Sequence, residues 1–513
     1  MRTFTVHSRL IAVAIACGFG FAAPAADQAQ WGAAWTRNMV SSERGLPDSF
    51  DPKTGRNIKW VAPLGSETHA TPVVAGGRVY IGTNNERPRD PRHKGDRGVL
   101  LCLDEKTAEL LCQLVIPKIT TSIYWDWPKA GTCSPPTVEG ERVYLVSNRG
   151  EVLCLDARGL ANGNDGPFRD EASHCVPAGE TPIEPKQTDA DILWVFDMVK
   201  DLGVRQHDSA HGSVLVDGDF LYVNTSNGLD DSHTEIHAPD APSLIVLEKS
   251  TGRLVARDDE HIGSNIFHST WSAPALAKVN GKPQIFFCGG NGVVYAFEPL
   301  AKAPPTGEIT KLKKLWQFDF DPTAPKEDVH RYKSNREVSP SNIHGMPVFD
   351  GNRLYVAGGG DLWWGKNEAW LKCIDATGTG DVTKTALAWS YALEKHVMAT
   401  PAVWNGMVFI ADCGRKIHCV DATNGKALWT HDAAAEVWAS ALVADGKVYF
   451  ATRRGEVFVF AADREKKLIS QTSLGDPISG TPIAANGTLY FATMKNLFAV
   501  AEGSQFPKAQ VAE

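Results

Sequence analysis

The sequence lacks the short motifs that mark several common classes of enzyme and binding protein. It contains neither CxxC nor CxxCH, so thioredoxin-type redox centres, zinc ribbons and c-type haem attachment have no support. It also has no GxSxG elbow, and no P-loop or GxGxxG that opens a helix. Serine-hydrolase chemistry and nucleotide binding therefore lack a positive signal.

An excess of positive charge is also absent. Lys and Arg number 52 against 60 Asp and Glu, a net charge of −8. Because phosphate binding needs a basic surface, nucleic acid is not expected as a partner. Past the first 25 residues no apolar run suggests a transmembrane segment.

The first 25 residues have the features of a secretory signal. Two arginines precede the apolar run 10–21, and Ala23-Pro24-Ala25 fits the small-x-small cleavage rule. We therefore predict a signal peptide over residues 1–25 and a periplasmic or secreted protein. Lipid attachment at Cys17 is the alternative.

The composition indicates a turn-rich β protein. The 513 residues include 46 Gly, 30 Pro and 15 Trp, with 43% hydrophobic and 22% charged residues, so a packed core is expected. Of the ten cysteines, four share a Cys-x-Asp context, which favours buried strand positions over a disulfide framework: Cys102, Cys154, Cys373 and Cys419.

One strand–turn–strand pattern occurs eight times along the chain. A small residue is followed by a Pro position, an apolar pair, a Gly-containing turn and an aromatic residue in a new strand. The aromatic residues are Tyr80, Tyr144, Tyr222, Phe286, Tyr355, Phe409, Tyr449 and Tyr490. The Gly turns supply the positive φ that tight hairpins need.

A second pair of strands follows each hairpin, most clearly over residues 414–429. Four strands per unit and eight units predict an all-β, eight-bladed β-propeller. The longer units carry insertions that we assign to blade loops, namely 84–98, 159–191, 227–242 and 359–370.

The two ends of the repeat predict how the ring closes. The last unit has three strands, whereas residues 50–60 resemble the end of a unit that has no beginning. The N-terminal strand should therefore complete the last blade and remove an open sheet edge. We divide the chain into a signal peptide (1–25), a leader segment (26–50), the propeller (51–503) and a flexible tail (504–513).

The unit Asp421-Ala-Thr-x-Gly425-x-x-Leu-Trp429 resembles the repeat of the PQQ-like (pyrroloquinoline-quinone-type) eight-bladed propellers. In that family the Trp packs against the next blade and the tryptophans form a girdle. The matching residues are Trp60, Trp194, Trp316, Trp389 and Trp429. The resemblance covers nearly the whole chain after residue 25.

The resemblance implies three kinds of function. Alcohol and sugar dehydrogenases of the family hold the quinone with calcium or a lanthanide, and the alcohol-oxidising members usually carry a vicinal cysteine pair. Those members also carry a catalytic aspartate. This sequence has no Cys-Cys pair, and the residues around Asp230-Asp231 do not match the surroundings of that aspartate. A second kind is the outer-membrane assembly lipoprotein, a scaffold without chemistry. The third comprises exported proteins of undetermined role, which residues 191–198 and 283–295 resemble most.

The position three residues before the Pro position marks a candidate binding ring. Its eight residues, each followed by a small one, are His69, Cys133, His211, Trp271, His344, Met398, Trp438 and Ser479. If the inner strands line the channel, these side chains form a ring at its mouth, and the first seven are our candidate cofactor-binding residues. Histidine, cysteine and methionine suit copper or iron, and tryptophan could stack a planar cofactor or a sugar.

Only neighbouring units could share one ion, because opposite blades are too far apart. His69, Cys133 and His211 are therefore the candidate metal ligands. The competing interpretation is structural: the ring side chains point between blades and hydrogen-bond across them, and the small neighbours satisfy packing.

Other polar and aromatic groups lie in the insertions. The loop residues Asn227, Asp230, Asp231, His233, Glu235 and His237 could hold a cation or form a solvated loop. Trp125-Asp126-Trp127 and Trp363-Trp364 could stack a sugar or cap the propeller face. His207, Asp208 and His268 precede their blades closely enough to reach the channel mouth.

These observations favour an exported PQQ-like propeller that binds a small ligand or cofactor at the channel mouth. The alternatives are a PQQ-dependent alcohol or sugar dehydrogenase and a non-catalytic envelope scaffold. Enzymatic activity is left open, and the cofactor is unknown, with PQQ plus calcium or a transition metal as options. We expect a monomer whose partner is a small molecule or an envelope protein.

Overall fold

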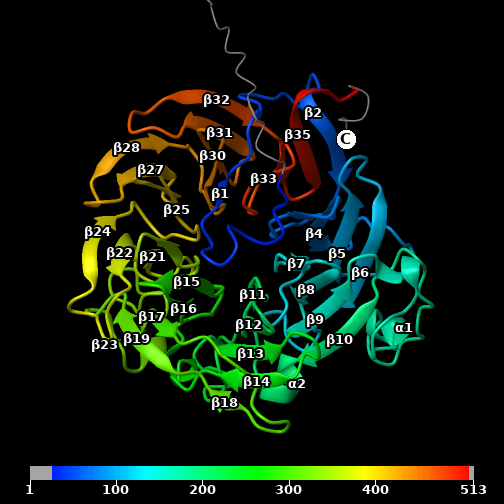
Figure 1. The fold of residues 1–513 in the computed structure, drawn as a ribbon, viewed down its shortest axis with the longest axis horizontal. Coiled ribbons are helices and arrows are strands. Elements are labelled where there is room, and N and C mark those ends of the chain that lie inside the picture. Colours follow the sequence, from blue (N-terminus) through cyan, green and yellow to red (C-terminus); the bar gives the residue numbers. More distant parts are fainter. Residues whose placement is uncertain (1–25, 508–513) are drawn as a thin grey trace, which may run out of the picture.

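Each of the eight repeat units folds into a four-stranded antiparallel sheet in the computed structural model, which describes residues 26–507. The sheets stand around a central channel as the blades of a propeller (Figure 1). The first strand of each blade lies nearest the channel, and the later strands lie successively further out. The prediction of an all-β, eight-bladed propeller is confirmed.

Strands account for nearly all of the regular structure. Blade one contains β3 (Val73–Ala75), β4 (Arg78–Asn84), β5 (Arg97–Asp104) and β6 (Leu110–Pro117), and blade two contains β7 (Thr137–Glu139), β8 (Arg142–Val146), β9 (Glu151–Asp156) and β10 (Ile192–Asp197). Blade three contains β11 (Leu215–Asp217), β12 (Phe220–Asn224), β13 (Leu244–Glu248) and β14 (Leu254–Arg257), and blade four contains β15 (Ala275–Val279), β16 (Lys282–Cys288), β17 (Val293–Phe297) and β19 (Lys314–Asp319). Short strands β18 (Thr310–Lys311) and β23 (Gly380–Asp381) extend the outer edges of blades three and four.

Blades five to eight repeat the same order. Blade five contains β20 (Val348–Asp350), β21 (Arg353–Gly359), β22 (Ala369–Asp375) and β24 (Leu387–Ala392), and blade six contains β25 (Ala402–Trp404), β26 (Met407–Ala411), β27 (Lys416–Asp421) and β28 (Ala427–Asp432). Blade seven contains β29 (Leu442–Ala444), β30 (Lys447–Ala451), β31 (Glu456–Ala461) and β32 (Leu468–Ser473), and blade eight contains β33 (Ile483–Ala485), β34 (Thr488–Ala492), β35 (Asn496–Gln505) and β2 (Arg56–Pro63). The helices are short: α1 (Glu171–His174), α2 (Met198–Leu202) and the 3-10 turns η1 (Gly159–Asn162), η2 (Gly263–Asn265) and η3 (Val329–Tyr332).

The inner hairpins have one register in all eight blades. The aromatic residue of the second strand always pairs with the first residue of the inner strand, as in Val73–Tyr80, Thr137–Tyr144, Leu215–Tyr222, Ala275–Phe286, Val348–Tyr355, Ala402–Phe409, Leu442–Tyr449 and Ile483–Tyr490. The insertions lie in loops between strands of one blade, as predicted. The shared register places the residues that precede the inner strands at one level around the channel.

The N-terminal strand closes the ring, as predicted. Strand β2 pairs antiparallel with β35 and forms the outermost strand of the eighth blade. Ile58 and Trp60 of this strand are 0% and 5% exposed. Strand β35 continues to Gln505, into the segment that was expected to be a tail.

Residues 26–50 cross the channel and contact every blade at its inner strand or within two residues of it (Figure 1, blue). Each inner strand is an edge strand with unpaired N–H groups. Main-chain carbonyls of the segment accept from the N–H groups of Val74, Val138, Leu276, Phe349 and Val443. Strand β1 (Val40–Ser41) pairs in parallel with β29. The leader segment therefore satisfies the edges of the blades from within the channel.

Arg37 of the leader segment lies at the centre of these contacts and is 0% exposed. Its guanidinium donates to the carbonyls of Pro274, Ser213 and Trp31. Burial lowers the pKa of Arg37 to about 9. Because the carbonyls come from the leader and from blades three and four, this side chain ties the segment to the inner ring.

The tryptophan girdle is present between blades. The indole N–H groups of Trp60, Trp194, Trp389 and Trp429 donate to main-chain carbonyls in the next blade, at Glu105, Lys249, Ala422 and Asp463 respectively. Trp316 differs, since its N–H donates to Gln284 of its own blade. The four cysteines of the Cys-x-Asp units are buried strand residues, as predicted, and the nine cysteines of the described chain are free thiols.

The signal peptide predicted over residues 1–25 and Cys17 lie outside the described residues. Within residues 26–507, no helix has the length and apolar character needed to cross a membrane.

A buried carboxylate at the start of β9 predicts an acid-sensitive blade. Glu151 is 5% exposed and is bonded to Ser147, Arg149 and His174. Burial alone would raise the pKa of Glu151, but the hydrogen bond and charge of His174 and the charge of Arg149 outweigh it and lower the pKa to about 2. An unfolded glutamate has a pKa of about 4.3, so this stabilisation is complete above that pH and is lost as the pH falls towards 2.

We expect Glu151→Gln to lower the free energy of unfolding by about 2–3 kcal/mol at pH 7 and to flatten its decline between pH 5 and pH 2. Urea unfolding at a series of pH values measures both effects. Glu141→Gln is the control: the Arg158 hydrogen bond also lowers the pKa of Glu141, but Glu141 is 54% exposed, so this substitution should change the decline of stability with acid much less. Equal acid sensitivity of the Glu151→Gln variant and the unsubstituted protein would contradict the assignment.

Candidate ligand site at the channel mouth

A cavity of about 740 Å³ occupies the mouth of the channel. All eight residues of the predicted ring line it: His69, Cys133, His211, Trp271, His344, Met398, Trp438 and Ser479. Each lies four residues before the first residue of its inner strand, as His69 does before Val73. The repeat thus brings the eight positions together around one space of a size typical for ligand pockets.

Aromatic rings form much of the cavity wall. Trp271 and Trp363 lie edge to face with ring centroids 5.7 Å apart, and Trp363 is also edge to face with Trp438 at 6.1 Å. Trp31 of the leader segment and Tyr124, Trp127 and Trp364 of the loops complete the aromatic lining. The cavity is therefore bounded by the ring, by the insertions and by the segment that crosses the channel.

Two cations at the cavity are held over aromatic rings. The Arg453 guanidinium lies 4.5 Å from the centre of the Trp438 ring and donates to Ser479. The Lys333 ammonium lies 4.6 Å from the centre of the Trp364 ring. These contacts fix positive charge beside flat apolar surfaces, an arrangement that suits a planar ligand with polar substituents.

The predicted metal ligands His69, Cys133 and His211 share the cavity wall, but each has its own surroundings. His69 Nε2 is 3.6 Å from Glu67 Oε2, Cys133 Sγ contacts the Ala130 carbonyl, and the His211 ring packs against Trp271. Burial raises the pKa of the Cys133 thiol to about 11 and lowers the pKa of His211 to about 3. In residues 26–507 the clustered metal-ligating groups are His207–Asp208–His268 and Asp156–Asp165–Asp191, so this trio stays a prediction.

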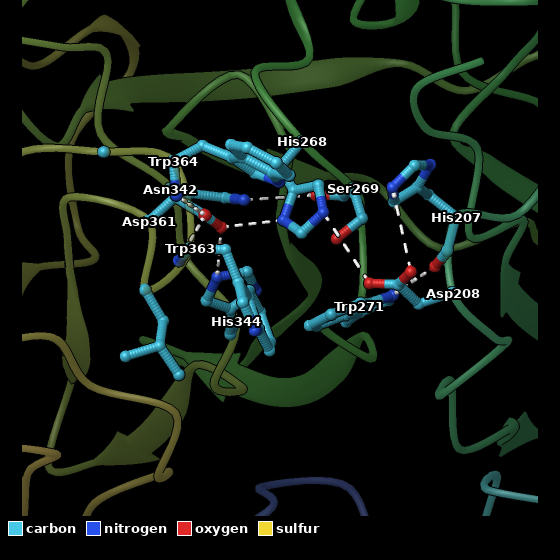
Figure 2. Close-up of polar contacts among 12 residues, drawn as sticks. His207, Asp208, His268, Ser269, Trp271, Asn342, His344, Asp361, Trp363 and Trp364 are labelled. Carbon is cyan, nitrogen blue, oxygen red and sulfur yellow. Dashed lines mark hydrogen bonds and ion pairs between the residues drawn. The ribbon is translucent and has the colours of Figure 1, made fainter. Parts of the chain in front are cut away.

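Asp361 is 0% exposed and bonds to four residues that line the cavity (Figure 2). Its Oδ2 accepts from His268 Nδ1 at 2.8 Å and lies 3.1 Å from His344 Nε2. Its Oδ1 accepts from the backbone N–H groups of Trp363 and Trp364 at 2.9 and 2.8 Å. One carboxylate therefore orients two histidines and the paired tryptophans.

His207 and Asp208 lie in the loop before blade three, and Asp208 approaches His268 from the side away from Asp361 (Figure 2). Nδ1 of His207 donates to the Leu229 carbonyl at 2.9 Å. The Asp208 carboxylate lies between the two imidazoles, with Oδ1 3.8 Å from His207 Nε2 and Oδ2 3.7 Å from His268 Nε2. Asp208 has a φ of 63°, and its backbone bonds to Tyr124 and Trp127 hold it in this turn.

Burial and neighbouring charge set the protonation of this group. Burial raises the pKa of Asp208 to about 6 and lowers that of His207 to about 3. Burial would lower the pKa of His268, but Asp361 and Asp208 outweigh it, so the net shift is upward. Burial would likewise raise the pKa of Asp361, but His268 and His344 hold it well below its usual range. The group thus combines the neutral imidazole of His207 with the buried ion pair between His268 and Asp361.

The structure separates the other sequence candidates. His233 lines the cavity beside Tyr124, with ring centroids 4.3 Å apart. Asp230 bonds to Ser232, and His237 packs on Trp125, so the polar loop does not gather around one point. Asp361 was missed by the sequence analysis, although it opens the insertion that carries Trp363-Trp364 and caps their N–H groups.

Comparisons with known proteins agree with the propeller. The family model described as "Outer membrane protein assembly factor BamB" matches residues 48–306 and 305–505. The crystal structure of BamB from Moraxella catarrhalis has a TM-score of 0.50 at 11% identity, with 88% of this chain and 98% of that chain covered. At this identity the likeness shows the fold alone.

Similarity to characterised enzymes is local in sequence. Over 61 residues the chain is 34% identical to a quinohemoprotein alcohol dehydrogenase from Comamonas testosteroni, a match that covers 12% of this chain and 9% of the enzyme. The crystal structure of quinohemoprotein alcohol dehydrogenase from the same organism has a TM-score of 0.49 at 13% identity, with 95% of this chain and 82% of that chain covered.

Proposed function

Because the chain belongs to the PQQ-like propeller family whose description is outer membrane protein assembly factor BamB, we propose that it is an exported propeller that binds a small molecule with a flat face at its channel mouth. The cavity of about 740 Å³ lined by all eight ring positions carries this proposal. A volume of this size, walled by aromatic rings with a few convergent polar groups, is typical of small-molecule sites. The apolar run and cleavage pattern of residues 1–25 support export.

The distribution of groups suggests how the ligand lies. Trp271, Trp363 and Trp438 offer ring faces and edges for stacking, and Arg453 and Lys333 offer positive charge beside them. The His207–Asp208–His268 cluster offers a polar end. A molecule with one flat or apolar face and oxygen substituents, either a carboxylated aromatic or a sugar, satisfies all three features.

A calcium-bound quinone does not fit this site. Calcium prefers about six to eight oxygen ligands, whereas the ligand group at this cavity has two imidazoles and one carboxylate. The sequence also lacks two adjacent cysteines. The family's quinone–calcium dehydrogenase chemistry is therefore not our proposal for this protein.

Ligand binding tests the proposal through the intrinsic tryptophan fluorescence. We expect saturable quenching at micromolar concentration by a carboxylated aromatic, with PQQ as one probe, or by an alkyl glycoside. Trp438→Ala should weaken binding about tenfold, the loss expected for one stacked ring. Calorimetry on the same pair of proteins provides the dissociation constants.

Trp404→Ala is the matched control, because Trp404 is a partly buried tryptophan in β25 that does not line the cavity. Its affinity should equal that of the unsubstituted protein. Absence of saturable binding by either probe class, together with retention of an envelope protein on an affinity column of this propeller, would replace the proposal with the scaffold function.

A further inference from the structure

Three buried imidazole nitrogens at the cavity, in His207, His268 and His344, have no hydrogen-bond partner, and those of His207 and His268 face one carboxylate. His207 and His268 are each 1% exposed, and Nε2 of both is unpartnered. A buried polar atom without a partner costs about 1–3 kcal/mol, and such atoms are rare in folded proteins. Two of them that face one carboxylate point to a ligand that accepts nitrogen lone pairs.

The contact of the second nitrogen of each ring shows that Nε2 is the nitrogen left to face an ion. A carbonyl oxygen can only accept, so His207 Nδ1 carries the proton that is shared with Leu229. A carboxylate holds the Nδ1 proton of His268 in the same way, through Asp361. In the neutral ring of His207, Nε2 is then an acceptor. In the His268 imidazolium, which is paired with Asp361, Nε2 carries a proton that a bound metal ion would displace. Fixing Nδ1 by a carbonyl or a carboxylate is the usual way in which metal-binding histidines are oriented.

The distances suit three ligands of one small ion. Metal–nitrogen and metal–oxygen bonds are about 2.0–2.2 Å, so two ligand atoms lie about 3.4 Å apart at a tetrahedral angle and at most about 4.2 Å apart. Asp208 is 3.8 Å from His207 Nε2 and 3.7 Å from His268 Nε2. The three ligand atoms all lie within 4.8 Å of one another. These separations are too long for hydrogen bonds, but small side-chain rotations bring them into the coordination range.

Asp208 leaves part of the coordination sphere facing the cavity. Its side chain is 26% exposed, whereas the side chains of His207 and His268 are each 1% exposed. Two histidines and one carboxylate with open positions form the ligand set of many divalent iron and zinc sites. The open positions would accept water or an oxygen of the molecule in the cavity.

We propose that His207, Asp208 and His268 bind one divalent first-row transition ion, such as zinc or iron(II), in the wall of the cavity. Asp361 is the positioning residue of this site, because it holds His268 without facing the ion. The proposal goes beyond the proposed function, since a propeller can bind an organic ligand without a metal. It also differs from the sequence-based trio of His69, Cys133 and His211.

Metal titration of the full, tag-free chain without organic ligand tests the site. After treatment with EDTA and dialysis, we expect one equivalent of Zn²⁺ by calorimetry and one equivalent of Co²⁺ with a visible absorption spectrum. His207→Gln and Asp208→Asn should each weaken Zn²⁺ binding at least 100-fold. Asp361→Asn should weaken it about 10- to 100-fold, as for other residues that orient metal ligands, and should change the Co²⁺ spectrum.

The controls separate this site from its competitors. His418 is bonded to Asp412 and Tyr391 in another buried histidine–carboxylate pair, so His418→Gln should bind Zn²⁺ normally. Circular dichroism confirms that each variant is folded before titration. Retention of stoichiometric Zn²⁺ by folded His207→Gln and Asp208→Asn, or its loss in Cys133→Ser instead, would overturn the proposal, as would no binding at micromolar Zn²⁺. None of these outcomes depends on organic ligand binding, so the proposed function is judged separately.

Discussion

A chain that begins at Leu64 should fail to form a stable monomeric propeller, whereas one that begins at Ala26 should form it. The shorter chain lacks β2, which leaves β35 as an open edge, and it lacks the leader segment that bonds to the inner strands. Loss of the buried Ile58 and Trp60 side chains alone should cost about 5–10 kcal/mol, which is comparable with the whole net stability of many proteins. Size-exclusion chromatography and thermal unfolding of the two chains measure the effect.

Point variants and an added peptide test whether the missing strand β2, and not the shorter length of the chain, causes the loss of stability. Ile58→Asp places a charge at a position that is 0% exposed and should also destabilise the ring, whereas Lys59→Ala, at a partly exposed position, should not. A peptide of residues 26–63, which supplies both the leader segment and β2, added to the shorter chain should restore the folded monomer. A chain from Leu64 that remains monomeric and unfolds at the same temperature as the longer chain would show that the eighth blade is complete without β2.

Trp389→Ala should lower the free energy of unfolding by about 3–5 kcal/mol. Trp389 is 8% exposed, and its N–H donates to the Ala422 carbonyl of the next blade at 3.0 Å. Its ring lies on Gly425, where an added Cβ would approach the indole to 2.7 Å. The substitution therefore removes an aromatic contact and a hydrogen bond across a blade interface. Chemical denaturation followed by fluorescence measures the loss.

Two further substitutions probe the same interface. Gly425→Ala should destabilise the protein without changing Trp389, because its φ is +72° and its Cβ would meet the ring. Trp35→Ala is the control, since Trp35 is 50% exposed and should change the stability by less than about 1 kcal/mol. Equal stabilities of the Trp389→Ala and Trp35→Ala variants would rule out the girdle contact as a source of stability.

The blades and the ring could be predicted because they repeat. Eight copies of the same hairpin register place His69 and Trp438 at equivalent positions, so a pattern in the sequence becomes a wall of the cavity in space. The closing strand was predictable for the same reason, since an incomplete first unit and an incomplete last unit complement each other.

The contacts of the insertions could not be predicted, because no repeat relates them. Asp361 lies in a loop of blade five and bonds to His268, which is 93 positions away in the loop before blade four. Neither residue type nor spacing indicates that partner, and the lone-pair direction of His268 depends on it. The course of residues 26–50 was equally hidden, since their main-chain carbonyls, which have no side-chain signature, make many of the contacts with the inner strands.

The leader segment also sets an order of assembly. Residues 26–50 are synthesised before any blade, yet their partners extend from Val74 in the first blade to Asn486 in the last. Contacts of such long sequence separation form late, so this segment settles only after the eighth blade has been made. Until then the inner strand edges are unprotected, and the nascent chain is prone to strand pairing with other chains. We therefore expect the first part of the propeller to leave the ribosome to be among the last parts to become ordered.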